Sequence, residues 1–216
     1  MKKILGILIG VLFIFSMISV SFAGTYMGKT SYGWVEKEVQ GNASSNETVV
    51  FITGVHPREY KFHNAVVSAV RGKSKTLSKK YVVYRVHVTK SRWNYYRGRM
   101  YGQLLANKFV VPDVKRQNAT LVVDFHENRW RSSGYKYGRF LDPISKNGQT
   151  YYYANKVKSA MPFLKIYDPP SGTSPKYVTQ PISKSGITTL IYETYKYDAY
   201  SKKYGHALWF ISVLDS

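Results

Sequence analysis

Three short runs of apolar, mostly β-branched residues constrain most strongly how this chain can fold. They are Thr48–Thr53, Thr120–Phe125 and Thr188–Tyr192, and each reads as a strand buried on both faces. A fourth predicted strand, Tyr81–Thr89, alternates apolar with polar residues. Stretches with helical spacing fall between the strands, at Glu59–Val70, Met100–Phe109 and Tyr151–Met161. This order predicts a single α/β domain with a mostly parallel mixed sheet flanked by helices.

The segments around these elements have weaker signals. We expect an edge strand or hairpin from Thr25 to Val39, and a final helix that runs towards Leu214 and is capped by Asp198 or Ser201. The helix at Met100 is expected to end before Pro112, and prolines dominate the segment between positions 169 and 181. Loops are predicted by composition at Gly41–Glu47, Arg71–Lys80, Lys90–Arg99 and Glu127–Gln149, and the last is long enough for an active-site lid.

The N-terminus has the pattern of an export signal. Lys2 and Lys3 precede an apolar run, and the small residues Ser21 and Ala23 form a cleavage site. We therefore predict a signal peptide at residues 1–23, or alternatively a membrane anchor through residues 4–22, followed by the α/β domain at 24–216. Either prediction makes the protein secreted or extracytoplasmic.

Composition limits the partners and the metal ligands. The formal net charge of the 216 residues is +20, which favours an anionic surrounding such as an envelope polymer or membrane headgroups. We find no nucleic-acid-binding motif and expect no nucleic acid partner. Because the chain has no cysteine, any metal must be held by histidine, aspartate or glutamate.

Chemically useful side chains follow the buried strands. His56 and Glu59 come after the first, His126 after the second and Glu193 after the last. Carboxyl ends of parallel strands meet at one edge of a sheet, where sites collect. Two histidines and a carboxylate can hold Zn²⁺ with one position left for water, and Glu193 is then free to move a proton. Taken singly, each of these residues is as compatible with a purely structural role as with a catalytic or metal-binding one.

Other assignments stay open at this point. His63, four residues after Glu59, offers a compact site without His126, and Glu127 could replace Glu59 or Glu193. Asp124 shares a strand face with His126 and could orient its imidazole. His87 and His206 have no ligand-like context.

These motifs resemble a known family. His56-Pro57-Arg58-Glu59, Asp124-Phe125-His126 and Ile191-Tyr192-Glu193-Thr194 are similar to the zinc carboxypeptidase superfamily, and most similar to its succinylglutamate desuccinylase and aspartoacylase branch. The resemblance implies a phosphorylase/hydrolase-like fold, and with it a zinc-peptidase-like domain at 24–216. It also implies zinc on His56, Glu59 and His126, with Glu193 as general base and acid.

The family cleaves an amide beside a free carboxylate that arginines and an Asn-Arg pair bind. No Asn-Arg pair precedes His126 here, so we expect Arg97, Arg99 and Asn94 to bind the substrate. A tyrosine, Tyr177, is a further candidate for substrate contact.

The sequence thus predicts an exported zinc-dependent hydrolase that cleaves an amide bond in a peptide or N-acyl amino acid, such as an envelope peptide. The alternative is a non-catalytic, basic envelope-binding protein with a decayed metallopeptidase fold. Zinc content and hydrolysis distinguish the two.

Overall fold

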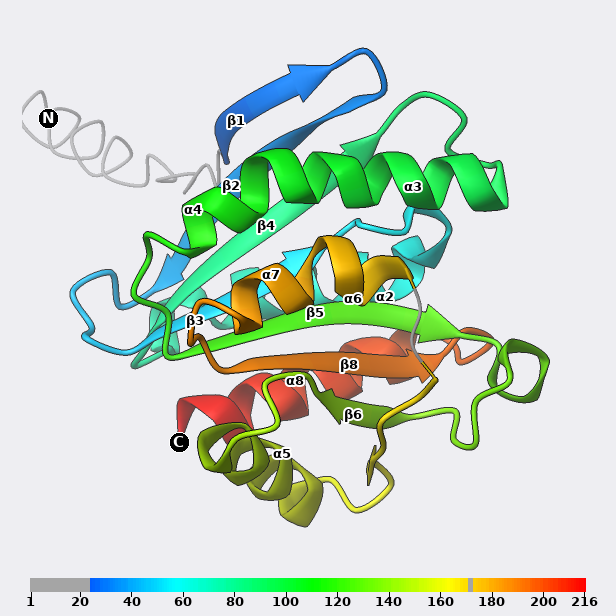
Figure 1. Ribbon diagram of the computed structural model, residues 1–216. Helices are drawn as coiled ribbons and strands as arrows, with labels where there is room; N and C mark the ends of the chain where they lie inside the picture. The colour runs from blue at the N-terminus through cyan, green and yellow to red at the C-terminus, as the bar shows by residue number, and fades with distance from the viewer. Residues whose placement is uncertain (1–23, 171–172) are drawn as a thin grey trace, which may run out of the picture.

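The computed structural model describes residues 24–170 and 173–216, so the predicted signal peptide at 1–23 lies outside the described residues. The described chain forms one mixed sheet of eight strands in the order β1-β2-β4-β3-β5-β8-β6-β7 (Figure 1). The strands are β1 (Thr25–Thr30), β2 (Gly33–Gly41), β3 (Thr48–Thr53), β4 (Lys80–Val88), β5 (Leu121–Asn128), β6 (Phe140–Pro143), β7 (Lys165–Ile166) and β8 (Thr189–Tyr195).

The four central strands are parallel, and an antiparallel pair joins them to the strands on either side. Strands β4, β3, β5 and β8 run parallel to one another, β2 pairs antiparallel with β4, and β6 pairs antiparallel with β8. The predicted α/β domain with a mostly parallel mixed sheet is confirmed, and so is the hairpin at the N-terminal end of the domain.

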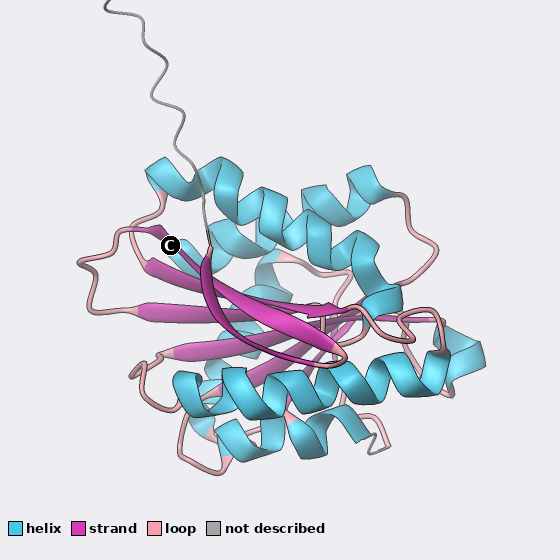
Figure 2. Ribbon diagram, turned by 90° about the horizontal axis from the view of Figure 1, so that it is seen from above, coloured by secondary structure: helices cyan, strands magenta, loops and turns pink. Residues whose placement is uncertain are grey.

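Helices cover both faces of the sheet, as the view from above shows (Figure 2). The longer ones are α2 (Tyr60–Lys73), α3 (Tyr95–Leu105), α5 (Gly148–Ala160) and α8 (Tyr200–Asp215); the short ones are α4 (Val111–Val114), α6 (Thr173–Tyr177) and α7 (Thr179–Ser183). Helices α2, α5 and α8 pack on one face, and α3, α4 and α7 pack on the other. No helix in the described part of the chain is long and apolar enough to cross a membrane.

Strand β3 shows why the buried strands are apolar throughout. Val49 and Phe51 pack into the core under α2 and α8, whereas Val50 and Ile52 pack into the core under α3. Successive side chains of a strand point to opposite faces, so a strand covered on both sides has no polar face.

The predicted loop at Lys90–Arg99 is wrong in its second half, because α3 already begins at Tyr95. Asn94 caps this helix: its side-chain oxygen accepts the Arg97 backbone N–H at 2.9 Å. The predicted stop before Pro112 is also wrong. The chain widens into a π-helical turn at Ala106–Val110 and then continues as α4 to Val114. Pro112 is the second residue of α4 and follows the π-helical turn directly.

The predicted long loop at Glu127–Gln149 contains regular structure instead. Strand β5 extends to Asn128, a short 3₁₀ helix follows at Trp130–Ser133, and β6 pairs with β8. Helix α5 begins at Gly148, where the Asn147 side chain accepts the Thr150 N–H. These elements are short, so they leave little periodic signal in the sequence.

Three further boundaries differ from the predictions. Helix α2 continues to Lys73, the proline-rich segment contains α6 and α7, and α8 is preceded by Ala199 without a side-chain cap. Asp198 instead accepts hydrogen bonds from Arg139.

Candidate functional site

A glycine turn after β3 carries the first two site residues. Gly54 has φ +84°, and a Cβ there would lie 2.1 Å from the Val86 carbonyl oxygen, so only glycine fits. The chain then turns through His56 into a 3₁₀ helix at Pro57–Glu59, and the Glu59 N–H donates to the His56 carbonyl at 2.9 Å. Both side chains are buried, at 3% and 4% exposure.

Helix α3 packs directly on this turn. A Cβ on Gly102 would lie 1.9 Å from the Val55 carbonyl oxygen, so the close approach requires glycine. The approach brings the Gln103 amide to 3.2 Å from His56 Nε2. It also lets Arg99 donate to Glu59 Oε1 at 2.8 Å.

His126 comes from the neighbouring strand β5 and completes a three-residue cluster. The Nδ1 atoms of His56 and His126 lie 3.0 and 2.9 Å from the two oxygens of Glu59. Each residue offers one ligand atom, and these three atoms all lie within 4.8 Å of one another, which is close enough to hold one metal ion. The far ring nitrogens are engaged by Gln103 and by Asp124, whose Oδ2 lies 2.9 Å from His126 Nε2. Both Nδ1 atoms therefore face the shared position, as metal ligands must.

Burial and the neighbouring charges set the protonation of the cluster. Burial lowers the pKa of His56 to about 3. Burial also lowers the pKa of His126, but the Asp124 and Glu59 carboxylates outweigh it and raise that pKa well above its usual value. For Glu59, burial raises the pKa, and His56 and His126 outweigh that effect and hold it well below its usual range. The Glu59 carboxylate is therefore ionised and can bind a cation.

Glu193 stands beside the cluster on the next strand. In the parallel pair of β5 and β8 it is the register partner of His126, so both side chains share one face of the sheet. Its Oε2 accepts the Asn128 amide N–H at 3.0 Å. Burial and the nearby Glu59 carboxylate raise the pKa of Glu193 to about 7 despite the opposing effects of His126 and Asn128. A carboxyl group with this pKa can both take and give a proton near neutral pH.

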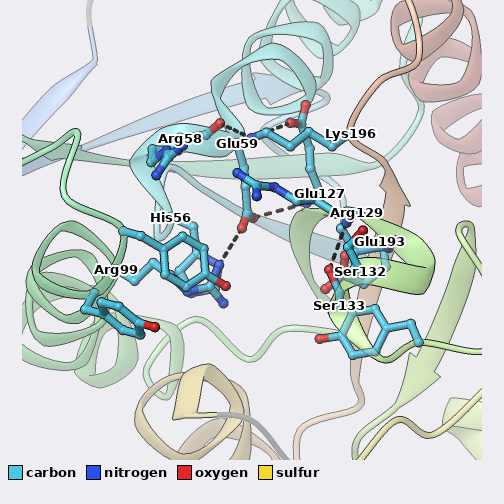
Figure 3. A pocket seen from close by; sticks show the side chains of 14 residues that line it. His56, Arg58, Glu59, Arg99, Glu127, Arg129, Ser132, Ser133, Glu193 and Lys196 are labelled. Atoms are coloured by element: carbon cyan, nitrogen blue, oxygen red, sulfur yellow. Dashed lines mark hydrogen bonds and ion pairs between the residues drawn. The ribbon is translucent and has the colours of Figure 1, made fainter.

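A cleft of about 480 Å³ opens over these residues (Figure 3). His56, Glu59 and Glu193 lie in its wall. Basic and aromatic side chains line the rest, among them Arg58, Tyr95, Tyr96, Arg99, Arg129, Tyr135 and Lys196. The cleft therefore offers a positively charged entrance above a buried acidic group.

The three predicted substrate-binding residues lie at the start of α3, and only one of them lines the cleft. Arg99 lines the cleft, whereas Arg97 is exposed and does not line it. Asn94 is exposed as well and uses its side-chain oxygen as the cap of α3. Tyr177 packs against the core beside α7, away from the cleft.

The alternative ligands lie outside the cluster. His63 is buried in α2 and its Nε2 donates to the Phe125 carbonyl at 2.8 Å. The Glu127 carboxylate points away and accepts the Phe62 N–H and the Lys203 ammonium, although its backbone N–H donates to Glu59 Oε2 at 3.1 Å. His87 stacks on Trp34 and His206 on Phe163, and neither lines the cleft.

Several residues that build the site gave no signal in the sequence. Gln103, Asn128 and Tyr135 lie in segments whose secondary structure was predicted with wrong boundaries or missed. Lys203 is a fully buried lysine that pairs with Glu127. A charged residue on the inner face of a predicted helix is the one signal that could have marked it.

Comparison with known proteins gives the fold. No protein-family model matches the sequence, and no curated protein is significantly similar to it. Solved structures do match. A metallo-carboxypeptidase from Burkholderia cenocepacia aligns over 89% of this chain and 64% of its own, with a TM-score of 0.61 and 11% identity. The chain has a metallo-carboxypeptidase fold.

Two other solved structures agree. The metallo-carboxypeptidase from Pseudomonas aeruginosa, in complex with (2-guanidinoethylmercapto)succinic acid, aligns over 89% of this chain and 62% of its own (TM-score 0.56, 11% identity). The tripeptide-bound cell shape determinant Csd4 from Helicobacter pylori aligns over 83% and 54% (TM-score 0.55, 11% identity). This chain thus spans between half and two thirds of these proteins. Its predicted likeness to the desuccinylase and aspartoacylase branch has no support among them.

Proposed function

We propose that the protein is an exported, zinc-dependent hydrolase that cleaves an amide bond in a peptide bearing a free carboxylate. The observation that carries this proposal is the convergence of His56, Glu59 and His126 beside the buried Glu193, at the base of an open cleft. The carboxypeptidase fold supports it, as do the tripeptide and mDAP bound in Csd4 structures. Export is supported by the N-terminal sequence pattern.

The donor set suits zinc. Two imidazoles and one carboxylate are a common catalytic zinc set, with a fourth position for water. A zinc ion held there would polarise the scissile carbonyl and lower the pKa of a water. Glu193 takes the proton of the attacking water and passes it to the leaving amine nitrogen, a role that its raised pKa suits.

The cleft cations bind and orient the substrate in this proposal. Arg99 is the predicted clamp residue that lines the cleft, and its planar guanidinium can pair with a carboxylate or carbonyl oxygen. Arg58, Arg129 and Lys196 supply further positive charge at the entrance. An N-acyl amino acid offers the same carboxylate and is the smallest substrate of this class.

The test measures metal content and peptide hydrolysis on the same purified protein. We expect bound zinc and hydrolysis in the wild type, and neither in His126→Ala. Glu193→Gln should keep the zinc and lose hydrolysis. His87→Gln is the matched histidine control, because His87 lies away from the cleft and pairs with Glu36, so zinc and hydrolysis should persist. Zinc-free, inactive wild-type protein that binds no added zinc would refute the proposal.

A second candidate is a non-catalytic envelope-binding protein. It is favoured by the net charge of +20 and by exposed aromatic residues in cation–π contact with arginines. The Arg92 guanidinium, for example, lies 4.7 Å from the ring centroid of Trp93. Such surfaces suit an anionic polymer. This candidate predicts polymer binding that is equal in wild type and Glu193→Gln, with no hydrolysis by the wild type.

A further inference from the structure

Three copies of one short motif, Asn-x-Ser/Thr, play no part in the chemistry described above. They are Asn42-Ala43-Ser44, Asn46-Glu47-Thr48 and Asn118-Ala119-Thr120. In exported proteins this motif is the acceptor for N-linked sugars, and an acceptor asparagine lies on a surface loop. A chance match can fall anywhere in the fold, so the positions of the three asparagines are informative.

All three asparagines lie at one edge of the sheet, the edge opposite the cleft. Asn42 and Asn46 are in the loop that leads into β3, and Asn118 is in the turn that leads into β5. These strands run parallel and side by side, with Val49 opposite Leu121, so their amino ends meet at one edge (Figure 1). The proposed metal ligands lie towards the carboxyl ends of the same strands. Because β3 has six residues, the two edges are roughly 20 Å apart. A group attached at the amino edge therefore leaves the cleft open.

The three asparagines are exposed, but the hydroxyl residues of their motifs differ in accessibility. Thr48 is the first residue of β3 and is 3% exposed, and the Thr120 hydroxyl accepts the Thr48 backbone N–H at 3.2 Å. Folding thus engages both threonines at the start of the sheet. Ser44 lies in the loop and is exposed like Asn42. Since the motif is defined by the asparagine and the hydroxyl residue together, the motif of Asn42 is the one of the three that stays fully accessible in the folded chain.

The conformation of the loop presents the Asn42 amide. Strand β2 ends at Gly41, where a φ of +75° turns the chain, and the Asn42 N–H donates to the Lys79 carbonyl at 3.1 Å. The Ser44 N–H donates to the Asn42 side-chain oxygen at 3.1 Å, which forms an Asx turn. A backbone N–H can donate only to the oxygen of an amide group. The side-chain nitrogen, the atom that bonds to a sugar, is therefore not used in this turn.

We propose that Asn42 carries an N-linked glycan. In the transfer, the side-chain nitrogen of Asn42 attacks the anomeric carbon of a sugar held on a lipid-linked phosphate. A carbon–nitrogen bond forms and the carbon–oxygen bond to the phosphate breaks. The lipid phosphate leaves with the electron pair, and the nitrogen loses a proton. The inference rests on the proposed export, because such sugars are attached outside the cytoplasm.

The test is peptide mass spectrometry of the full chain, recovered from the cells that naturally produce it. Trypsin releases Asn42 and Asn46 together in Glu38–Arg58, and releases Asn118 in Gln117–Arg129. We expect the first peptide to be heavier than its sequence by whole sugar residues, and fragmentation by electron transfer should place the sugar on Asn42. A bare Asn42 would overturn the proposal, whether or not either of the other two asparagines is modified.

Substitutions in the loop separate the motif from its surroundings. Asn42→Gln and Ser44→Ala should each abolish the modification at position 42, whereas Ser44→Thr should keep it. Ser45→Ala is the matched serine control, because Ser45 lies next to the motif and outside it, so the sugar should persist. A sugar on Asn42 that survives in Ser44→Ala, or that is lost in Ser45→Ala, would contradict the assignment. A thermal melt of each variant confirms that it is folded.

The failure of this inference can be told apart from the failure of the proposed function. Fractionation of the same cells and N-terminal sequencing test export. A bare Asn42 in exported protein would refute the glycan and keep export, whereas protein found only in the cytoplasm would refute both. Hydrolysis by Asn42→Gln should equal that of the wild type, because the loop lies at the opposite edge from the cleft. A glycan on Asn42 of a protein without hydrolysis would refute the hydrolase and keep the glycan.

Discussion

The buried carboxyl group of Asp142 should make the stability of the protein depend on pH. Burial, with the Asp168 carboxylate adding to it, raises the pKa of Asp142 from 3.8 to about 7. The folded state therefore binds this proton more tightly than the unfolded state does. Its stabilising contribution is complete below about pH 4 and is lost as pH rises through 7.

The magnitude follows from that difference. Between about pH 4 and 7 the unfolded state releases the proton and the folded state keeps it, so the free energy of unfolding falls by about 1.4 kcal/mol for each pH unit. Over about three units the loss reaches about 4 kcal/mol, and it stays constant at higher pH. Asparagine has nearly the same shape and does not titrate. Asp142→Asn should therefore be close to neutral at pH 4 and stabilising, by up to about 4 kcal/mol, at pH 8.

Urea denaturation followed by tryptophan fluorescence, at a series of pH values from 4 to 8.5, measures this difference. Asp198→Asn is the control with the opposite sign. Burial raises the pKa of Asp198, but the hydrogen bonds from Arg139 and Lys202 outweigh it and lower that pKa. Its substitution should destabilise at every pH above about 4. An Asp142→Asn effect that is the same at pH 4.5 and pH 8 would refute the reasoning.

Three further predictions concern the site itself. Asp124→Asn should weaken zinc binding about 10- to 100-fold, because the carboxylate orients His126; competition with a chelating dye measures this. Lys203→Met should cost about 3–5 kcal/mol by leaving Glu127 buried without its cation, and Lys203→Met with Glu127→Gln should recover most of the loss in urea denaturation. The rate of hydrolysis should decline as the pH falls through the pKa of Glu193. This pKa should be at or below about 7, because a bound cation lowers it. A decline at the same pH in Glu193→Asp would contradict this assignment.

The central strands could be predicted because two physical constraints act on the same residues. A strand such as β3 is covered on both faces and must be apolar at every position, which leaves a run that stands out in the sequence. Its end is marked by Gly54, where φ is positive. His56 and Glu59 follow directly, so their place at the sheet edge could be predicted as well.

The surroundings of the site could not be predicted, because they depend on contacts between distant segments. Strand β6 is four residues long and owes its place to pairing with β8. Helix α3 begins in a stretch dense in tyrosine and arginine, whose composition favours a loop until Asn94 is recognised as a cap. With α3 misplaced, Arg97 and Arg99 could not be told apart, although one is exposed and the other lines the cleft.

The register of the sheet places the proposed metal ligand His126 beside the proposed base Glu193. His126 on β5, Glu193 on β8 and Phe140 on β6 form one row across the sheet; Asp124, Ile191 and Asp142 form the next. A slip of one residue in either strand pair would turn a whole set of these side chains to the opposite face, so the backbone hydrogen bonds between β5 and β8 fix the position of Glu193 relative to His126.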